Sequence, residues 1–217
     1  LNLLKEPNIA SKHWIYEQYD KEVQLRTVTK SNQDASITKI TDEAGMVLGV
    51  GCNSKHCSID PIEGSKESLA EALRNITAVG GRPLAAVDCL NFGNPEKPKA
   101  MWQFKVSVEN LAEGLKFFNI PVISGNVSFY NETSGKAINV SPIVTLVGKV
   151  DLDKTMSMPL KDEGDEIVLI GETKAELGYA PKVDFETEKK TNDLILKLIY
   201  DKKINAEHDL SKGCLDV

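Results

Sequence analysis

Two groups of oxygen-bearing side chains each follow a short apolar run in the middle of the chain. The first group follows residues 84–87 and the second follows residues 122–123. Hard cations such as Mg²⁺ accept oxygen ligands, and a metal ion together with backbone N–H groups can hold a small phosphorylated ligand. The candidates for one polar cluster are Asp88, Asn91, Asn94, Ser124, Asn126, Ser128, Asn131 and Glu132.

The sharpest local signal is the sequence Ser-Gly-Asn-Val-Ser at residues 124–128, which is expected to be a loop. Gly125 allows the backbone to approach a ligand closely, while Asn126 and Ser128 offer neutral oxygens two residues apart. Mg²⁺ keeps several waters and shares substrate phosphates, so this segment together with Asp88 could form a nucleotide site. An ordinary turn rich in Asn, Ser and Gly has the same composition, so both interpretations stay open.

Several familiar motifs are absent from the sequence. Neither GxxxxGK[ST] nor GxGxxG occurs, which disfavours the folds that bind phosphate through those loops. None of the three histidines has an evident sequence relation to Cys89, and a buried small thiol is a better interpretation than a Cys–His nucleophile. His208 and Asp209, which precede Ser211, could bind a phosphate or cap a helix, and we favour capping.

A strand, a helix and a second strand are expected to position the polar cluster. Residues 99–118, between the two apolar runs, carry apolar side chains at helical spacing. A crossover of this length favours parallel strands in one sheet, so both polar groups would leave the same edge. Open α/β sheets tend to bind ligands at the carboxyl ends of their strands, and we expect the active surface there.

Further elements are expected on either side of this unit. Ser65 is expected to cap a helix that Gly80 and Gly81 end, and Asp60 could be functional or could begin a turn. A loop is expected over 52–64 and 171–181, and a turn over 131–135. Strands are expected over 21–29, 34–40, 46–50 and 166–170, and a hairpin or a paired strand over 137–150. Helices are expected over 11–20 with Trp14 and Tyr16 packing, over 65–79, and over 185–200 with Leu194, Leu198 and Ile199 facing inward.

This pattern predicts an α/β (α+β) fold, a mixed sheet with helices on one face followed by a truncated second α/β domain. The polar segment after residue 151 is expected to be a linker. The first domain would be residues 1–152, carrying the nucleotide and Mg²⁺ motifs, and the second a partial domain of residues 153–217. The chain begins with Leu1 and stops at Val217 just after a turn-like segment, so we expect part of a longer polypeptide.

Composition narrows the class of protein. The chain has 217 residues, of which 41% are hydrophobic and 27% charged, as in globular proteins that bury a core. A net charge of -6 argues against nucleic-acid binding. The absence of a membrane-length apolar run argues against a membrane span. The four cysteines lack CxxC spacing, which argues against structural zinc, and scattered thiols fit a cytoplasmic protein.

Three motifs together resemble the large subunit of phosphoribosylformylglycinamidine synthase. They are DCLNFGNPEKP at residues 88–98, MWQF at 101–104 and SGNVSFYNE at 124–132. QYD at 18–20, AEALRN at 70–75 and AEHDLSKG at 206–213 extend the similarity over nearly the whole chain. That family has two tandem copies of an A domain followed by a B domain, in a fold like that of aminoimidazole ribonucleotide synthetase. This chain resembles the second A domain and the start of the second B domain.

The resemblance implies an ATP-dependent ligase of purine biosynthesis. In that family ATP activates the formyl-amide oxygen of formylglycinamide ribonucleotide through an iminophosphate, and ammonia displaces phosphate to give formylglycinamidine ribonucleotide. By motif position, Asp88 and Gly125 would contact ATP, Asn126 would ligate Mg²⁺ and Ser128 would contact the nucleotide substrate. A glutaminase subunit that releases ammonia from glutamine and a small accessory subunit would be partners.

Two departures limit the resemblance. The catalytic histidine of the family belongs to the first A domain, and none of the three histidines matches its motif. The closing Ser-Asp-Gly-Gly motif of the family is Ser-Lys-Gly-Cys at residues 211–214. We therefore expect the isolated chain to hold about half of a composite site, to be inactive alone and to form a homodimer through its first domain.

Two other interpretations stay open. One is a related ATP-using kinase or synthase of the same superfold, such as aminoimidazole ribonucleotide synthetase or selenophosphate synthetase. The other is a non-catalytic nucleotide-binding scaffold that holds glutaminase partners.

Overall fold

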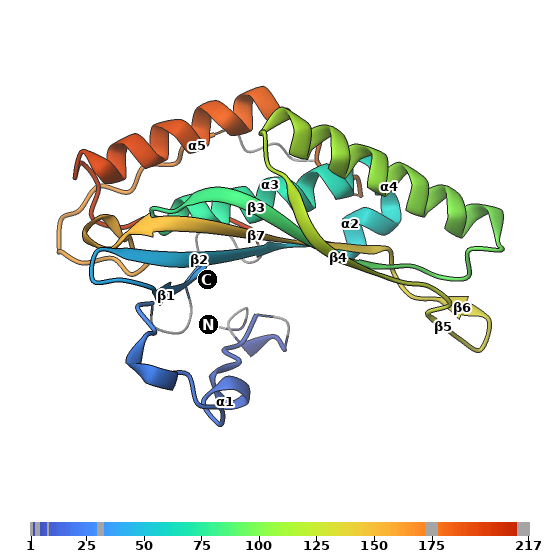
Figure 1. Ribbon diagram of the computed structural model, residues 1–217, viewed down its shortest axis with the longest axis horizontal. Helices are drawn as coiled ribbons and strands as arrows, with labels where there is room; N and C mark the ends of the chain where they lie inside the picture. The colour runs from blue at the N-terminus through green and yellow to red at the C-terminus, as the bar shows by residue number, and fades with distance from the viewer. Residues whose placement is uncertain (1, 3–4, 8, 30–32, 172–177, 212–217) are drawn as a thin grey trace.

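One mixed five-stranded sheet forms the centre of the molecule. The computed structural model describes residues 2, 5–7, 9–29, 33–171 and 178–211. The strand order is β1-β2-β7-β3-β4, and Figure 1 shows α2, α3, α4 and α5 on the same side of the sheet. The predicted mixed sheet with helices on one face is confirmed. The strands are β1 Ser36–Lys39, β2 Ala44–Gly51, β3 Arg82–Asn91, β4 Val122–Ser128 and β7 Ser141–Asp151.

The central strand–helix–strand unit is formed by β3, α4 and β4. Helix α4 spans Pro98–Phe117 and returns the chain so that β4 runs parallel to β3, as predicted. The other neighbouring strands, β1 with β2, β2 with β7 and β7 with β3, pair in antiparallel fashion. Strand β4 is therefore an edge strand whose only partner among the described strands is β3.

Helix α3 lies directly on the sheet and begins earlier than the sequence predicts. It spans Pro61–Ala78, and the Asp60 carboxylate accepts hydrogen bonds from the backbone N–H groups of Ile62 and Glu63. Asp60 is thus the N-cap, and Pro61 follows it at a position where proline fits a helix. Ser65, the predicted cap, is instead buried within the helix and donates to the Pro61 carbonyl oxygen.

The predicted loop at 52–64 contains a short helix, α2, and the first residues of α3. Helix α2 spans Ser54–Ile59, and the side chain of Asn53 caps it by accepting a hydrogen bond from the His56 N–H. The helix predicted over 65–79 is otherwise confirmed. Helix α3 ends at Ala78 with Val79 as its C-cap, and Gly80 follows with φ +85, a conformation that glycine adopts without a steric penalty.

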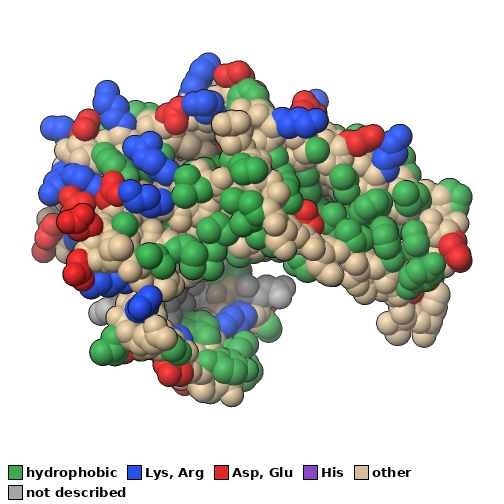
Figure 2. Space-filling model, viewed as in Figure 1, with side chains coloured by type: hydrophobic (Ala, Val, Ile, Leu, Met, Phe, Trp, Pro, Cys, Tyr) green, Lys and Arg blue, Asp and Glu red, His purple; other side chains and the backbone are tan. Residues whose placement is uncertain are grey.

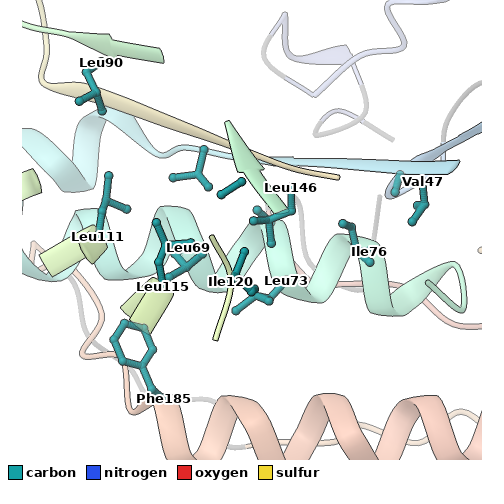
Figure 3. Packing of buried hydrophobic residues seen from close by; sticks show 14 of the residues in the cluster. Val47, Leu69, Leu73, Ile76, Leu90, Leu111, Leu115, Ile120, Leu146 and Phe185 are labelled. Carbon is teal, nitrogen blue, oxygen red and sulfur yellow. The ribbon is translucent and has the colours of Figure 1, made fainter. Parts of the chain in front are cut away.

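The hydrophobic core fills the space between the sheet and α3. Figure 3 shows Leu69, Leu73 and Ile76 of α3 among side chains from the strands and from α4, including Leu146, Leu111 and Leu115. Strands β2 and β7 alternate strictly between buried and less buried residues, so one face of each supplies this core. The core therefore rests on one face of the sheet only.

Helix α5 extends the core through a single aromatic residue. It spans Phe185–Tyr200, the bounds that the sequence predicts, and Asp184 caps it. The Phe185 ring stacks on Phe117 with ring centroids 5.9 Å apart and meets Phe118 edge-on at 5.5 Å. The predicted inward face of α5 is partly wrong, because Ile199 is buried and Leu198 half-buried but Leu194 is 45% exposed.

Ion pairs hold the segment around residue 208. The Arg74 guanidinium binds Glu188 at 2.9 Å and Asp209 at 2.6 Å, so α3 is linked to α5 and to this segment. His208 pairs with Asp34 at 2.8 Å. The residues that would form a helix after His208 and Asp209 lie mostly outside the described part of the chain, as does the Ser-Lys-Gly-Cys motif, so the capping role stays a prediction.

The carboxyl group of Glu207 lies in the same buried cluster. Burial and the charges of Asp34 and Asp209 together raise its pKa to about 8. A carboxyl group whose pKa is raised in the folded state contributes stability fully below its unfolded pKa and loses this contribution as the pH rises to the folded pKa. The contribution of Glu207 is therefore complete below about pH 4.5 and is lost by about pH 8.

Two predicted strands near the ends of the chain are wrong. Residues 21–29 contain the 3₁₀ helix η2 Val23–Leu25 and one isolated bridge from Thr27 to Thr38, not a strand. Residues 166–170 have no strand partner among the described residues. A strand needs a neighbour to satisfy its backbone groups, and apolar composition alone does not supply one.

The predicted N-terminal helix is short and does not pack as expected. Helix α1 spans His13–Tyr16, and Trp14 is 68% exposed while Tyr16 is only half-buried. The predicted turn at 131–135 joins the two-residue strands β5 Glu132–Thr133 and β6 Lys136–Ala137. Of the two alternatives predicted over 137–150, the paired strand is confirmed as β7, which begins at Ser141 and pairs with β2 and β3. The remaining element is the 3₁₀ helix η3 Leu152–Lys154.

The predicted loop at 171–181 lies largely outside the described residues. The division into domains at residue 152 stays a prediction. Among the described helices, none combines the length and the apolar character that crossing a membrane requires.

The core position of Phe185 gives a stability prediction. Phe185→Ala should lower the free energy of unfolding by about 3–5 kcal/mol, because truncating a buried aromatic ring leaves a cavity beside Phe117 and Phe118. Leu194→Ala on the exposed face of the same helix is the matched control and should change it by about 0.5 kcal/mol or less. Urea denaturation measures both. An equal loss in the two variants would contradict this packing of α5.

Candidate functional site

The candidate site residues lie on β3 and β4, at the edge of the sheet. In the parallel register Asp88 lies beside Gly125, Cys89 beside Asn126 and Asn91 beside Ser128. Residues 124–128 are therefore part of a strand, and the predicted loop is wrong. Hydrogen bonding along β3 overrides the turn-forming tendency of Asn, Ser and Gly, because the fit to a neighbouring strand decides strand formation.

Asp88 and Gly125 share the face of the sheet that the helices cover. Asp88 lies opposite Val144 of β7, which is buried in the core. A Cβ placed on Gly125 would lie 2.5 Å from the Asp88 Oδ1 atom, so the missing side chain of Gly125 makes room for this carboxylate. The two residues are brought together as predicted.

Asn126 and Ser128 face the opposite side. Successive side chains along a strand alternate between faces, so these two residues share the uncovered face with their β3 neighbours Cys89 and Asn91. The prediction of one cluster on one side is therefore wrong, and the candidates divide between the two faces of a single edge strand.

The Asp88 carboxylate sits at the wall of a small apolar cavity under α4. Burial raises its pKa, and a hydrogen bond from the Asn126 backbone N–H partly offsets this effect. The cavity has a volume of about 100 Å³. Its lining residues come from β3, β4, β7 and α4: Ala86, Val87, Asp88, Leu90, Val108, Leu111, Ala112, Leu115, Val122 and Val144.

The cavity is too small for a nucleotide. Ligand sites in proteins measure roughly 300–1,000 Å³, whereas this one holds about 100 Å³. Strand β4 is exposed along nearly its whole length on both faces, and Val122, Ile123 and Val127 are exposed apolar residues. Figure 2 shows an extended hydrophobic area over this side of the molecule. A ligand that contacts both faces of β4 would have to pass around its free edge.

A second polar group lies just beyond the carboxyl ends of β3 and β4. The Asn131 amide donates to the Phe92 carbonyl oxygen at 3.0 Å and to the Ser128 hydroxyl at 3.1 Å. The Glu132 carboxylate accepts a hydrogen bond from the Asn94 N–H at 3.1 Å. The structure thus brings these four candidates together in two adjacent pairs, Ser128 with Asn131 and Asn94 with Glu132.

Sequence reasoning overlooked Lys97 at this end of the sheet. Its ammonium group pairs with Glu132 at 2.7 Å and lies at the start of α4, where it is the N-cap residue. The pKa of Glu132 is lowered, and the hydrogen bond from Lys97 is the largest cause. Lys97 lies within the DCLNFGNPEKP motif, and its position before Pro98, a residue typical of helix starts, could have indicated it.

The two remaining candidates have different surroundings. Asn91 donates to the Cys89 and Ser141 carbonyl oxygens, so its amide is engaged within the sheet. Ser124 is exposed on β4, opposite Val87, and stands apart from the polar pairs at the strand ends.

The residues at the edge fit a magnesium ion only in part. Among the described residues there is no group of three or more acidic, histidine or cysteine side chains placed to hold a metal. The exposed Asn126 amide could supply one neutral oxygen, and Mg²⁺ commonly takes its other ligands from water and substrate phosphates. Asp88, on the other face, would not share the same ion in this arrangement.

The close approach of Gly125 to Asp88 gives a prediction about coupling. Gly125→Ala should lower the free energy of unfolding by about 1–3 kcal/mol, because the added methyl group displaces the half-buried Asp88 carboxylate. In an Asp88→Ala background, Gly125→Ala should lower the free energy of unfolding only slightly. The control Ser124→Ala should have little effect on it with or without Asp88→Ala. A double-mutant cycle by urea denaturation measures this coupling. Strictly additive effects of the two substitutions would contradict it.

Comparison with known proteins places this arrangement in a family. The model of the AIR synthase related protein N-terminal domain matches residues 32–150. A phosphoribosylformylglycinamidine synthase subunit PurL from Methanothermobacter marburgensis is 44% identical, over all of this chain and 33% of the relative. The chain thus spans about a third of the length of the curated relatives it matches.

Solved structures agree with this placement. PurLQS from Thermotoga maritima is 28% identical with a TM-score of 0.65, over 69% of this chain and 25% of that one. T. maritima PurL complexed with ADP and with FGAR is 25% identical, with TM-scores of 0.68, over 88% of this chain and 31% and 30% of those chains. The resemblance to the phosphoribosylformylglycinamidine synthase family is confirmed. The chain therefore belongs to the family of AIR synthase related proteins, of which residues 32–150 form the N-terminal domain.

Proposed function

We propose that this chain is one nucleotide-binding half of the composite site of a phosphoribosylformylglycinamidine synthase. The assembled enzyme would be an ATP-dependent C–N ligase that converts formylglycinamide ribonucleotide to formylglycinamidine ribonucleotide in purine biosynthesis. ATP would activate the formyl-amide oxygen as an iminophosphate, and ammonia derived from glutamine would displace the phosphate. The chain corresponds best to the second A domain with the start of the second B domain.

One observation carries the half-site proposal: the sheet face away from the core helices carries several half-buried apolar side chains among polar ones. Residues of β2 and β7 that point away from the helices include Met46, Leu48, Ile143 and Val147. An antiparallel sheet that meets water on one face normally carries polar residues there. Apolar side chains on such a face, next to an exposed edge strand, are typical of a surface that another domain covers.

Ligand roles follow from the position of each residue around the free edge of β4. Asp88 and Gly125 would contact ATP, and Gly125 leaves the backbone accessible at the point where a ligand crosses the edge. Asn126 would ligate Mg²⁺ and Ser128 would contact the nucleotide substrate on the other face. The two faces would be joined into one site when the partner domain closes over β4.

The residues of this chain would act mainly by positioning. A bound Mg²⁺ would neutralise charge that develops on the transferred phosphoryl group. Asn126 would orient that ion, while Asp88, held in place by the Asn126 N–H, would fix the nucleotide. Lys97 and Glu132 would fix the start of α4 beside the strand ends.

The partners proposed for this chain follow from the sheet face away from the helices and from the family resemblance. The missing first half of the synthetase would cover this sheet face and supply the catalytic histidine. A glutaminase subunit would deliver ammonia, and a small accessory subunit would complete the assembly. Cytoplasmic location is part of the proposal, since Cys52, Cys57 and Cys89 form no disulfide bond.

A non-catalytic scaffold is the second candidate. Its support is the cavity beside Asp88, which at about 100 Å³ holds no nucleotide, and the division of the candidate ligands between two faces. In that case the chain would hold its partners without taking part in turnover. A related kinase or synthase of the same superfold remains a weaker alternative, because the 44% identity extends over the whole chain.

Reconstitution tests the proposed function. The chain alone should show no turnover of ATP and formylglycinamide ribonucleotide with ammonia, and adding the first half of the synthetase should restore it. In the reconstituted enzyme, Asp88→Ala or Asn126→Ala should lower kcat/KM by about tenfold or more, since each removes a charged or metal-directed contact. Asn139→Ala, at an exposed asparagine outside the cluster, is the matched control. Unchanged rates in the first two variants would favour the scaffold.

The apolar side chains on the sheet face away from the helices predict self-association of the isolated chain. Without the first half, two copies should pair through their uncovered faces, and Val147→Lys should shift this equilibrium towards monomer by about tenfold or more, because it places a charge in the interface. Leu194→Lys, at an exposed leucine on α5, should leave it unchanged. Sedimentation velocity at several concentrations measures both variants. A monomer at every concentration would contradict the pairing.

A further inference from the structure

The start of α2 brings two cysteines into contact. Asn53 is the N-cap of α2, so Cys52 precedes the cap and Cys57 is the fourth residue of the helix. Side chains at these two positions commonly pack against each other across the first turn. The Cys57 thiol is hydrogen-bonded to Cys52, and this bond, with burial and the charge of Cys52, raises the pKa of Cys57.

Helix α3 holds both cysteines in place. The Cys52 N–H donates to the Glu71 carboxylate at 2.8 Å. Cys57 packs against Gly64, where an added Cβ would lie 2.9 Å from the Cys57 Sγ atom, and its thiol contacts the Ser68 hydroxyl at 3.8 Å. These contacts fix the Cys52 backbone and the Cys57 side chain against the same helix.

Only one of the two thiols is accessible. Cys52 is partly exposed, whereas Cys57 is fully buried. Reaction with a reagent in solution must therefore begin at Cys52, and Cys57 can only react with what Cys52 has become.

We propose that Cys52 and Cys57 form a reversible disulfide by exchange with a small-molecule disulfide. The Cys52 thiolate attacks one sulfur of the reagent, which forms a mixed disulfide and releases one thiolate. Cys57 then loses its proton and attacks the Cys52 sulfur, which forms the Cys52–Cys57 bond and releases the second thiolate. The two protein thiols are oxidised, and the reagent is reduced to two thiols that take up the two protons.

The bond would lie at the same end of the sheet as the candidate site. Cys57 is followed by Ser58, whose hydroxyl accepts a hydrogen bond from the Val140 N–H at 3.1 Å. Val140 leads into β7, where the Ser141 carbonyl oxygen accepts from Asn91. Oxidation would thus fix the first turn of α2 beside the strand ends, in a setting where disulfides are usually transient.

Peptide mapping after treatment with oxidised glutathione tests the proposal. Lys55 lies between the two cysteines, so trypsin releases residues 40–55 and 56–66 as separate peptides with one cysteine each. The full chain is treated, its remaining thiols are blocked with N-ethylmaleimide at about neutral pH, and it is digested without reductant. We expect the two peptides to appear as a linked pair, two hydrogens lighter than their sum, and dithiothreitol to release them.

Variants assign the order of reaction. Cys57→Ser should trap glutathione on Cys52, Cys52→Ser should leave Cys57 unmodified, and Cys89→Ser should give the wild-type linked pair. Far-UV circular dichroism shows whether each variant folds, and the wild-type result does not depend on them. A glutathione adduct on residues 40–55 with peptide 56–66 still unmodified, or linkage of peptide 56–66 to Cys89 or Cys214, would overturn the proposal.

Discussion

The core helices cover only one face of the mixed sheet, and the rest of the structure depends on this constraint. All the helices that pack in the core lie on the same side of the mixed sheet, and α3 supplies most of the apolar side chains that meet it. The other face, on whose side Figure 1 shows the N-terminal segment with α1, keeps Met46, Leu48, Ile143 and Val147 half-buried and outside the core. Burial of apolar area is the main stabilising contribution to folding and association, so such a face favours a second domain or a second copy.

Strand β4 links this constraint to the candidate chemistry. It is the edge strand, and it carries Gly125, Asn126 and Ser128 beside Asp88 of β3. Since alternate residues of a strand face opposite ways, one short polar sequence addresses both sides of the sheet. A ligand held by all of these groups has to lie at the free edge, where a covering domain would also bind. The incomplete cavity beside Asp88 and the uncovered sheet face therefore have the same physical explanation.

The sequence predicts most of the central unit and little of its local geometry. The apolar period of residues 99–118 and of 185–200 predicts α4 and α5 well, because long amphipathic helices depend on their own periodicity. Residues 124–128 appear as a loop in sequence because the hydrogen bonds that make them a strand come from β3, far away in the chain. The predicted strand at 166–170 fails for the opposite reason, since its composition is suitable but no described strand lies beside it. Which face Asp88 and Asn126 occupy depends on register, which composition does not reveal.

Hydrogen exchange at β4 tests the composite site most directly. In the lone chain, at a concentration where it is monomeric, the amides of residues 122–128 should exchange rapidly, whereas α3 amides in the core should be protected. Adding the first half of the synthetase should slow exchange in β4 by about tenfold or more and leave α3 unchanged, because a covering domain buries only the edge and the apolar face. Equal β4 exchange rates with and without that half, in a complex shown to form, would contradict the account.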